Sequence, residues 1–214
     1  SAERRNQGQV PEGPAPKPSI DTRPEIKVLF LPPYAVRAVV DRHLEYARDA
    51  VKSMVGPGYR LTFIEAEPTY SDDGVFNPSS YWIKPHDKDL DRRRKLLRKQ
   101  LFAGIVGVLG AVVKYNPSII VGAEQGGLLA LLCARCLVLE AAGRARILTS
   151  IELRAMRESW ARVVSIIGIN PHVIPQRTDL AEVQAAVPEC AFRQPAGQHR
   201  MVLIHEKIGG VYKH

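Results

Sequence analysis

A glutamate lies in the middle of a glycine-rich turn in the second half of the chain. The apolar residues 119–121 lead into Gly122-Ala123-Glu124-Gln125-Gly126-Gly127, and a small, apolar stretch follows. A strand that enters such a turn and leaves it as a helix raises the central residue at the helix N-terminus, where the helix dipole favours a negative charge. Glu124 is therefore either a surface carboxylate held by the helix N-terminus or a carboxylate that acts as a nucleophile.

Four other segments accompany this turn in a definite order: residues 28–34, which end in Pro32-Pro33-Tyr34; residues 60–68, which end in Pro68; residues 167–175, which contain Asn170-Pro171; and residues 195–200, which contain Gly197-Gln198-His199. With the turn at Glu124, which we call the elbow (residues 122–127), they span residues 26–205. In this order and spacing the five segments resemble the α/β-hydrolase family, and more closely its small serine-hydrolase and carboxylesterase-like members.

The resemblance implies a three-layer α/β-hydrolase-like fold with a mostly parallel central sheet. It places Glu124 where the family has its serine, and Pro171 where the family has its catalytic acid. Pro32 and Pro33 replace the His-Gly of the oxyanion loop, and proline has no N–H to donate. A serine hydrolase needs a nucleophile, a base and an acid that orients the base, and only His199 matches that set.

We therefore expect a catalytically degenerate domain that serves as a binding or structural module, without serine-hydrolase activity. The alternative is an active hydrolase, esterase-like or with a carboxylate nucleophile, in which Glu124 and His199 still act. The resemblance allows this because haloalkane dehalogenases of the same fold use an elbow aspartate. His199 would then need an orienting carboxylate from Glu152, Asp179 or Glu206. Further residues of the expected site, in binding roles, are Pro33, Tyr34, Gln125 and Asn170.

A basic segment over residues 84–99 suggests a second surface. On a helix its cations surround most of the surface and leave Leu90, Leu96, Leu97 and Leu101 to face a core. The segment is either a solvated helix face or an electrostatic contact for phosphate or an acidic protein surface. No aromatic residues interleave with it, which argues against stacking on single-stranded nucleic acid. The candidate anion-contact residues are Arg92, Arg93, Arg94, Lys95, Arg98 and Lys99.

The sequence indicates no cofactor and no metal ion. It has no Walker loop, no Gly-x-Gly-x-x-Gly after the first strand, and no histidines at ligand spacing. Cys133 and Cys136 lie at i and i+3 in an apolar stretch, where they are predicted to fill a core rather than to bind a metal.

Short apolar runs alternate with helical patterns from residue 25 onward. Runs of this kind without polar alternation predict strands buried on both faces, hence a mostly parallel sheet with helices on each side. The expected strands are residues 26–31, 59–64, 118–122, 145–151, 163–167, a short one around Ala191, and 201–208 at the far edge. We expect the order second, first, third, fourth, fifth. The expected helices are residues 35–55, 87–115, 127–142 and 178–187, and residues 69–86 are expected to form a surface loop.

Composition limits the classes of protein. The chain has 214 residues, is 45% hydrophobic and carries a net charge of +8, which suits a globular protein that could contact an anionic partner. The proline-rich residues 1–24 are predicted to be a flexible arm, and residues 25–214 the domain. Three cysteines and no apolar leader favour a cytoplasmic or other reducing compartment. No membrane span is expected, and other subunits or domains of a larger assembly are candidate partners.

Overall fold

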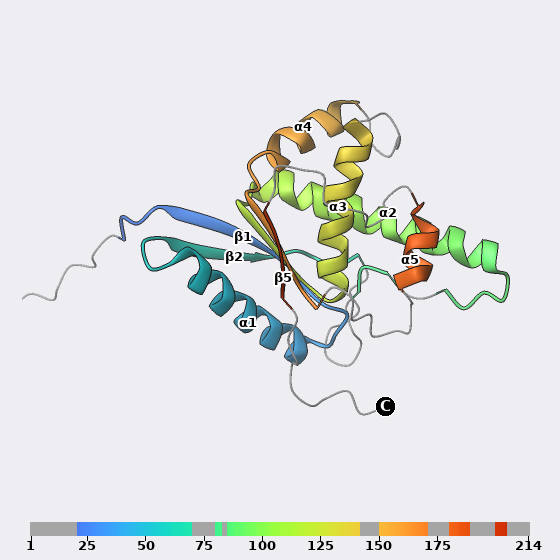
Figure 1. Ribbon diagram of the computed structural model, residues 1–214, viewed down its shortest axis with the longest axis horizontal. Helices are drawn as coiled ribbons and strands as arrows, with labels where there is room; N and C mark the ends of the chain where they lie inside the picture. The colour runs from blue at the N-terminus through green and yellow to red at the C-terminus, as the bar shows by residue number, and fades with distance from the viewer. Residues whose placement is uncertain are drawn as a thin grey trace, which may run out of the picture.

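The computed structural model describes residues 21–69, 80–82, 85–141, 150–170, 180–188 and 200–204. Strands and helices alternate along the chain (Figure 1): β1 (Glu25–Leu31), α1 (Arg37–Val55), β2 (Arg60–Glu65), α2 (Leu90–Tyr115), β3 (Ile119–Ala123), α3 (Gln125–Ala141), α4 (Ser150–Trp160), β4 (Ser165–Ile169), α5 (Leu180–Ala186) and β5 (Arg200–Ile204).

The five described strands form one parallel sheet in the order β2-β1-β3-β4-β5. The strand β1 lies inside the sheet, as predicted: its Val28 pairs with Phe63 of β2 on one side and with Ile119 of β3 on the other. Both β3 and β4 are buried along their whole length, as their continuous apolar sequences predict. The α/β class with a parallel sheet is confirmed.

Helices cover both faces of the sheet (Figure 1). On one face, α1 packs Val40, Ala47 and Val51 against a cluster that includes Val28 and Phe30 of β1. On the other face, α2 and α3 build a larger cluster, with α4 and α5 at its margins. The three-layer arrangement therefore follows from strands that are apolar on both sides.

The fourth predicted strand is wrong where it can be checked. Ser150 and Ile151 begin α4, and β4 pairs directly with β3, so residues 165–169 take the position predicted for residues 145–151. The good helix formers after Ser150, among them Glu152 and Ala155, favour the helix over residues 150–160. Residues 142–149 and the strand predicted around Ala191 lie outside the described residues. The edge strand predicted at 201–208 is present as β5, up to Ile204.

The prediction that residues 69–86 form a surface loop is wrong at residues 80–82, which are buried. Tyr81 and Trp82 are 1% and 0% exposed and belong to the cluster under α2 and α3. The segment is rich in Asp, Pro, Ser and Gly, which favours a surface loop. Burial of two large aromatic side chains nevertheless stabilises the fold enough to hold this part of the segment in the core.

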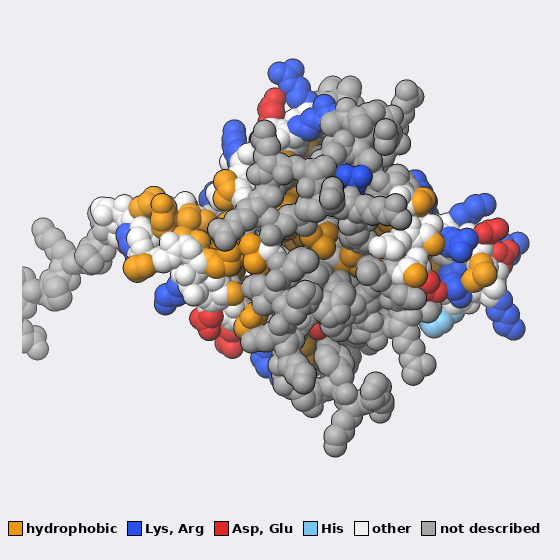
Figure 2. Space-filling model, in the orientation of Figure 1, with side chains coloured by type: hydrophobic (Ala, Val, Ile, Leu, Met, Phe, Trp, Pro, Cys, Tyr) orange, Lys and Arg blue, Asp and Glu red, His pale blue; other side chains and the backbone are white. Residues whose placement is uncertain are grey.

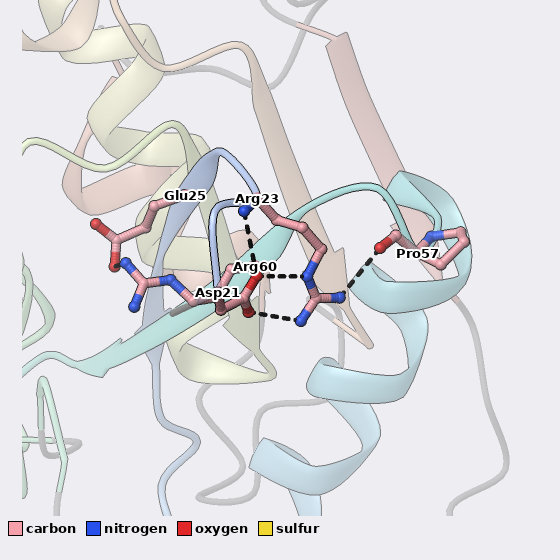
Figure 3. A network of polar contacts seen from close by, with 5 residues as sticks. All are labelled: Asp21, Arg23, Glu25, Pro57 and Arg60. Carbon is pink, nitrogen blue, oxygen red and sulfur yellow. Dashed lines mark hydrogen bonds and ion pairs between the residues drawn. The ribbon is translucent and has the colours of Figure 1, made fainter. Parts of the chain in front are cut away.

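Before β1, the chain is tied to the turn between α1 and β2 (Figure 3). Arg23 donates to the Asp21 carboxylate and to the carbonyl oxygen of Pro57, at 3.1 Å for the latter. Hydrogen bonds from Arg23 lower the pKa of Asp21 to about 2. Specific contacts thus begin at Asp21, before the predicted boundary between residues 24 and 25, and residues 1–20 lie outside the described part.

By length and composition alone, α2 is the one described helix that could cross a membrane. In this fold its apolar side, including Leu101, Ile105 and Leu109, is buried in the main cluster. The helix begins at Leu90 with Asp89 as its N-cap, whose carboxylate accepts from the backbone N–H groups of Asp91 and Arg92. The predicted helix over 127–142 is α3, with Cys133 buried as expected.

Candidate functional site: a buried carboxylate at the elbow

The elbow adopts the predicted strand-turn-helix geometry. Glu124 has a left-handed backbone, with φ of +48°, between the end of β3 and the start of α3. Its N–H donates to the carbonyl oxygen of Ile169 at 2.7 Å, and its carbonyl oxygen accepts from the N–H of Leu128 at 2.9 Å. The residue thus extends the β3–β4 ladder and starts the helix. A non-glycine residue in this backbone region costs on the order of 1 kcal/mol, so the surrounding structure must hold it there.

Close backbone packing is what holds the turn. A Cβ atom at Gly126 would overlap the carbonyl oxygens of Leu31 and Pro32, at the end of β1, and a Cβ atom at Gly122 would overlap the backbone of Gly126. The two glycines are therefore required by the approach of α3 to the sheet and to the loop after β1.

The Glu124 side chain points into the protein and meets a histidine from the other layer. Its Oε1 lies 3.6 Å from Nε2 of His43 on α1, and the two side chains are 3% and 2% exposed. This is an ion-pair distance, longer than a normal hydrogen bond. The interpretation of Glu124 as a surface carboxylate is therefore wrong: the helix N-terminus and His43 together hold it in the interior.

Geometry also decides which ring nitrogen of His43 carries a proton. Its Nδ1 lies 2.9 Å from the Val39 carbonyl oxygen, which can only accept, so Nδ1 carries a proton. In the neutral ring Nε2 would then turn a lone pair toward the Glu124 carboxylate, and only the imidazolium presents a proton to it. Burial lowers the pKa of His43, but the Glu124 carboxylate and the Val39 carbonyl oxygen raise it more, and the pKa lies above its usual value.

Gln125, for which a binding role is predicted, has a structural role in the fold. It is 0% exposed, its Oε1 accepts from the N–H of Tyr81 at 2.8 Å, and its Nε2 donates to the carbonyl oxygen of Trp82 at 2.9 Å. One side chain thus satisfies the backbone of the buried aromatic pair and attaches it to the start of α3.

The other predicted binding residues lie at the same edge of the sheet. Pro33 is buried and Tyr34 half-buried just after β1, next to the elbow through the pairing of Leu31 with Gly122. Asn170 follows β4, is 6% exposed and has a left-handed φ of +45°. His199 and Pro171 lie outside the described residues, so the predicted approach of His199 to Glu124 stays a prediction.

His43 is the site residue that the sequence reasoning missed. It lies on the buried face of α1, three residues after Val40 and four before Ala47. A histidine at a core position of an amphipathic helix was the available signal, because a buried imidazole needs polar partners. Among the described residues, no group of three or more His, Cys, Asp or Glu side chains could hold a metal ion.

The predicted anion-contact residues separate into two groups. Arg93 pairs with Glu182 of α5 at 2.8 Å, and Arg98 donates to the Ala186 carbonyl oxygen at 3.1 Å while covering the Phe102 ring. These two cations hold α5 against α2. The exposed ones are Arg92, Arg94, Lys95 and Lys99, and Figure 2 shows Lys and Arg side chains gathered at the end of the molecule where α2 begins.

Two leucines predicted to face the core are on the outside instead. Leu90 and Leu96 are 53% and 47% exposed, whereas Leu97 and Leu101 are buried. Leu90 lines a small cavity of about 170 Å³ between α2 and α5, next to Arg93 and Glu182.

Comparison with known proteins adds no family assignment: no family model matches the chain, and no curated protein matches it.

Proposed function

We propose that this chain is a non-catalytic α/β-hydrolase-like domain that serves as a binding or structural module. The observation that carries the proposal is the placement of Glu124. The residue in the nucleophile position has a side chain 3% exposed and faces His43. A nucleophile must reach the carbon it attacks, and this carboxylate is committed to an interior pair.

The strand-end loop beside the elbow supports the same proposal. An acyl-transfer site needs N–H donors aimed at the developing oxyanion. Pro32 and Pro33 have none, and the backbone atoms that approach Gly126 from this loop are the carbonyl oxygens of Leu31 and Pro32. Carbonyl oxygens repel an oxyanion, so the loop lacks the electrostatics of an oxyanion hole.

An active hydrolase that uses Glu124 and His199 is the second candidate. The left-handed backbone at Glu124 favours it, because a strained turn of this kind is also how active members of the fold would present a nucleophile. His43 does not supply the missing base, since its Nδ1 faces the Val39 carbonyl oxygen and its Nε2 is buried against Glu124.

Turnover of short-chain p-nitrophenyl esters tests the proposal. We expect no turnover above background by the wild-type chain, and none by Glu124→Ser. The new serine would still lack an orienting acid, whose loss costs about ten-thousand-fold in the best-studied triad. It would also lack an oxyanion donor, whose loss costs about a hundred- to a thousand-fold.

Matched variants show whether any turnover depends on Glu124 and His199. Glu158→Gln removes an exposed carboxylate on α4 and serves as the control for Glu124→Gln. Wild-type turnover that disappears in both Glu124→Gln and His199→Ala, but not in Glu158→Gln, would overturn the proposal and establish the second candidate.

A further inference from the structure

A small cavity lies between the first turns of α2 and helix α5. Its volume is about 170 Å³, and its walls are mostly apolar: Pro85, Leu90, Leu97, Ala181 and Ala185. Leu97 is buried, whereas Leu90, Ala181 and Ala185 are exposed. The cavity is therefore an apolar site that solvent, or another molecule, can reach.

The size of the cavity limits what can enter it. Sites for independent small ligands usually have about 300–1,000 Å³, whereas a cavity of about 150 Å³ holds one benzene molecule. The cavity of this chain, at about 170 Å³, thus has room for one bulky apolar side chain, such as that of leucine or phenylalanine. A single buried side chain of this kind is a common anchor of one protein on another.

Contacts within the chain hold the two walls together. Arg93 pairs with Glu182 of α5 at 2.8 Å, and Arg98 donates to the carbonyl oxygen of Ala186 at 3.1 Å. Figure 1 shows α5 beside the first half of α2. Because these contacts are already made, the cavity exists before a ligand binds, and binding does not have to order α5 first.

The surroundings of the cavity are basic. The basic segment over residues 84–99 contains eight basic and three acidic residues, and Figure 2 shows Lys and Arg side chains gathered at this end of the molecule. Arg94 lines the cavity, and its side chain is 54% exposed. Its contact with Asp91, at 3.8 Å on the surface, contributes little stability. The Arg94 guanidinium can therefore turn to a carboxylate that arrives beside the cavity.

We propose that the cavity between α2 and α5 binds an acidic peptide segment of a partner protein. One leucine or phenylalanine side chain of the segment fills the cavity, and a neighbouring carboxylate pairs with Arg94. The inference rests on the binding role proposed above and names its partner class, at a site separate from the elbow.

An acidic segment with an apolar anchor uses both features of the site. Free phosphate or a nucleic-acid backbone would meet the cations but would leave the apolar walls of Leu90 and Ala185 unused. A wholly apolar partner would cover Arg94 without supplying the negative charge that its desolvation requires.

Fluorescence anisotropy with labelled peptides and the full chain tests this inference. The probe is a peptide with one phenylalanine between two runs of three glutamates, and the matched peptides carry alanine for the phenylalanine or glutamines for the glutamates. We expect a dissociation constant on the order of 100 µM for the probe, because the contact is much smaller than the ~800 Å² per partner of a standard interface. Both matched peptides should bind about tenfold more weakly or worse, since each lacks one of the two interactions.

Variants of the chain locate the binding. Ala185→Leu fills the cavity from an exposed position, and Arg94→Glu reverses the charge at its wall. Each should raise the dissociation constant of the probe about tenfold, with an unchanged circular-dichroism spectrum. The controls Ala103→Leu and Arg154→Glu make the same changes at exposed positions of α2 and α4 that do not line the cavity, and they should bind like the wild type.

Three results would overturn the inference. They are no binding of the probe at 500 µM chain, equal binding of the phenylalanine and alanine peptides, which would indicate a general anion surface, and binding that folded Ala185→Leu leaves unchanged. The peptide comparison needs only the wild-type chain, so it decides the inference even where a variant does not fold. None of these results bears on ester hydrolysis, so the inference and the non-catalytic role fail independently.

Discussion

At the scale of single residues, the Val39 carbonyl oxygen decides how Glu124 and His43 interact. It fixes the proton on Nδ1 of His43 and so makes the pair with Glu124 depend on protonation of Nε2. A buried pair of this kind gives little net stability compared with apolar residues, but removing one partner leaves the other uncompensated. The main structural effect of the pair is therefore to keep the Glu124 carboxylate in the protein interior.

The pH dependence of stability follows from the raised pKa of His43. A group whose pKa is higher in the folded state contributes stability that is complete below its unfolded pKa, about 6.5, and is lost as the pH rises through the folded value. We expect Glu124→Gln to cost about 3 kcal/mol in the free energy of unfolding near pH 6. The difference from the wild type should shrink toward pH 9.

Urea denaturation of both chains at several pH values measures this difference, and Glu158→Gln controls for the loss of a negative charge. A difference that is constant from pH 5 to pH 9, or that grows with pH, would contradict a protonated His43 beside Glu124.

Of the two residues in this pair, only Glu124 was predicted from the sequence, because the glycine-rich turn that contains it is a local pattern. The spacing of glycines around Glu124 predicts the turn without any tertiary information. His43 comes from a helix on the opposite face of the sheet, and only the packing of α1 shows which strand end its ring reaches. Burial of Glu124 has the same cause and was not foreseen either.

At the scale of elements, the elbow depends on backbone contacts that admit no side chain. Gly126→Ala should lower the free energy of unfolding by about 3 kcal/mol, because the new methyl group would force α3 away from Leu31 and Pro32. Gly58→Ala is the matched control. Its site is open, so the change should be neutral or stabilising by up to about 1 kcal/mol.

Thermal or urea unfolding compares the two glycine variants. Equal stabilities for Gly126→Ala and Gly58→Ala would show that α3 does not approach the loop after β1 as closely as described.

Strands and helices in which the apolar residues follow one clear pattern were predictable. Segments that combine apolar residues with a polar or turn-forming context were not. The runs of β1, β2 and β3 and the apolar stripe of α1 gave their positions to within a few residues. Tyr81 and Trp82 were missed because they follow a polar segment, and their burial depends on Gln125 far along the chain. Leu96 was placed inward because a sequence cannot show that α2 keeps an outward apolar face, and Leu90 because the cavity between α2 and α5 depends on the packing of α5.

At the scale of the whole molecule, the α/β class was predictable because strands that are apolar on both sides need helices on both faces. The positions of β1 and β2 followed from the same pattern and from right-handed crossovers. The neighbour of β3 did not, because residues 165–169 pair with β3 where a strand over residues 145–151 was predicted. The finer α/β-hydrolase-like assignment stays a proposal that depends on the elbow.

The imidazole of His43, followed by NMR over a pH titration in the wild type and in Glu124→Gln, tests most directly whether the elbow carboxylate is held in an interior pair. We expect a pKa above the ordinary value of about 6.5 in the wild type. In Glu124→Gln the effect of burial should dominate, and the pKa should fall below that value. The same pKa in both chains, near 6.5, would mean that Glu124 does not face His43, and the elbow carboxylate would again be free to meet a substrate.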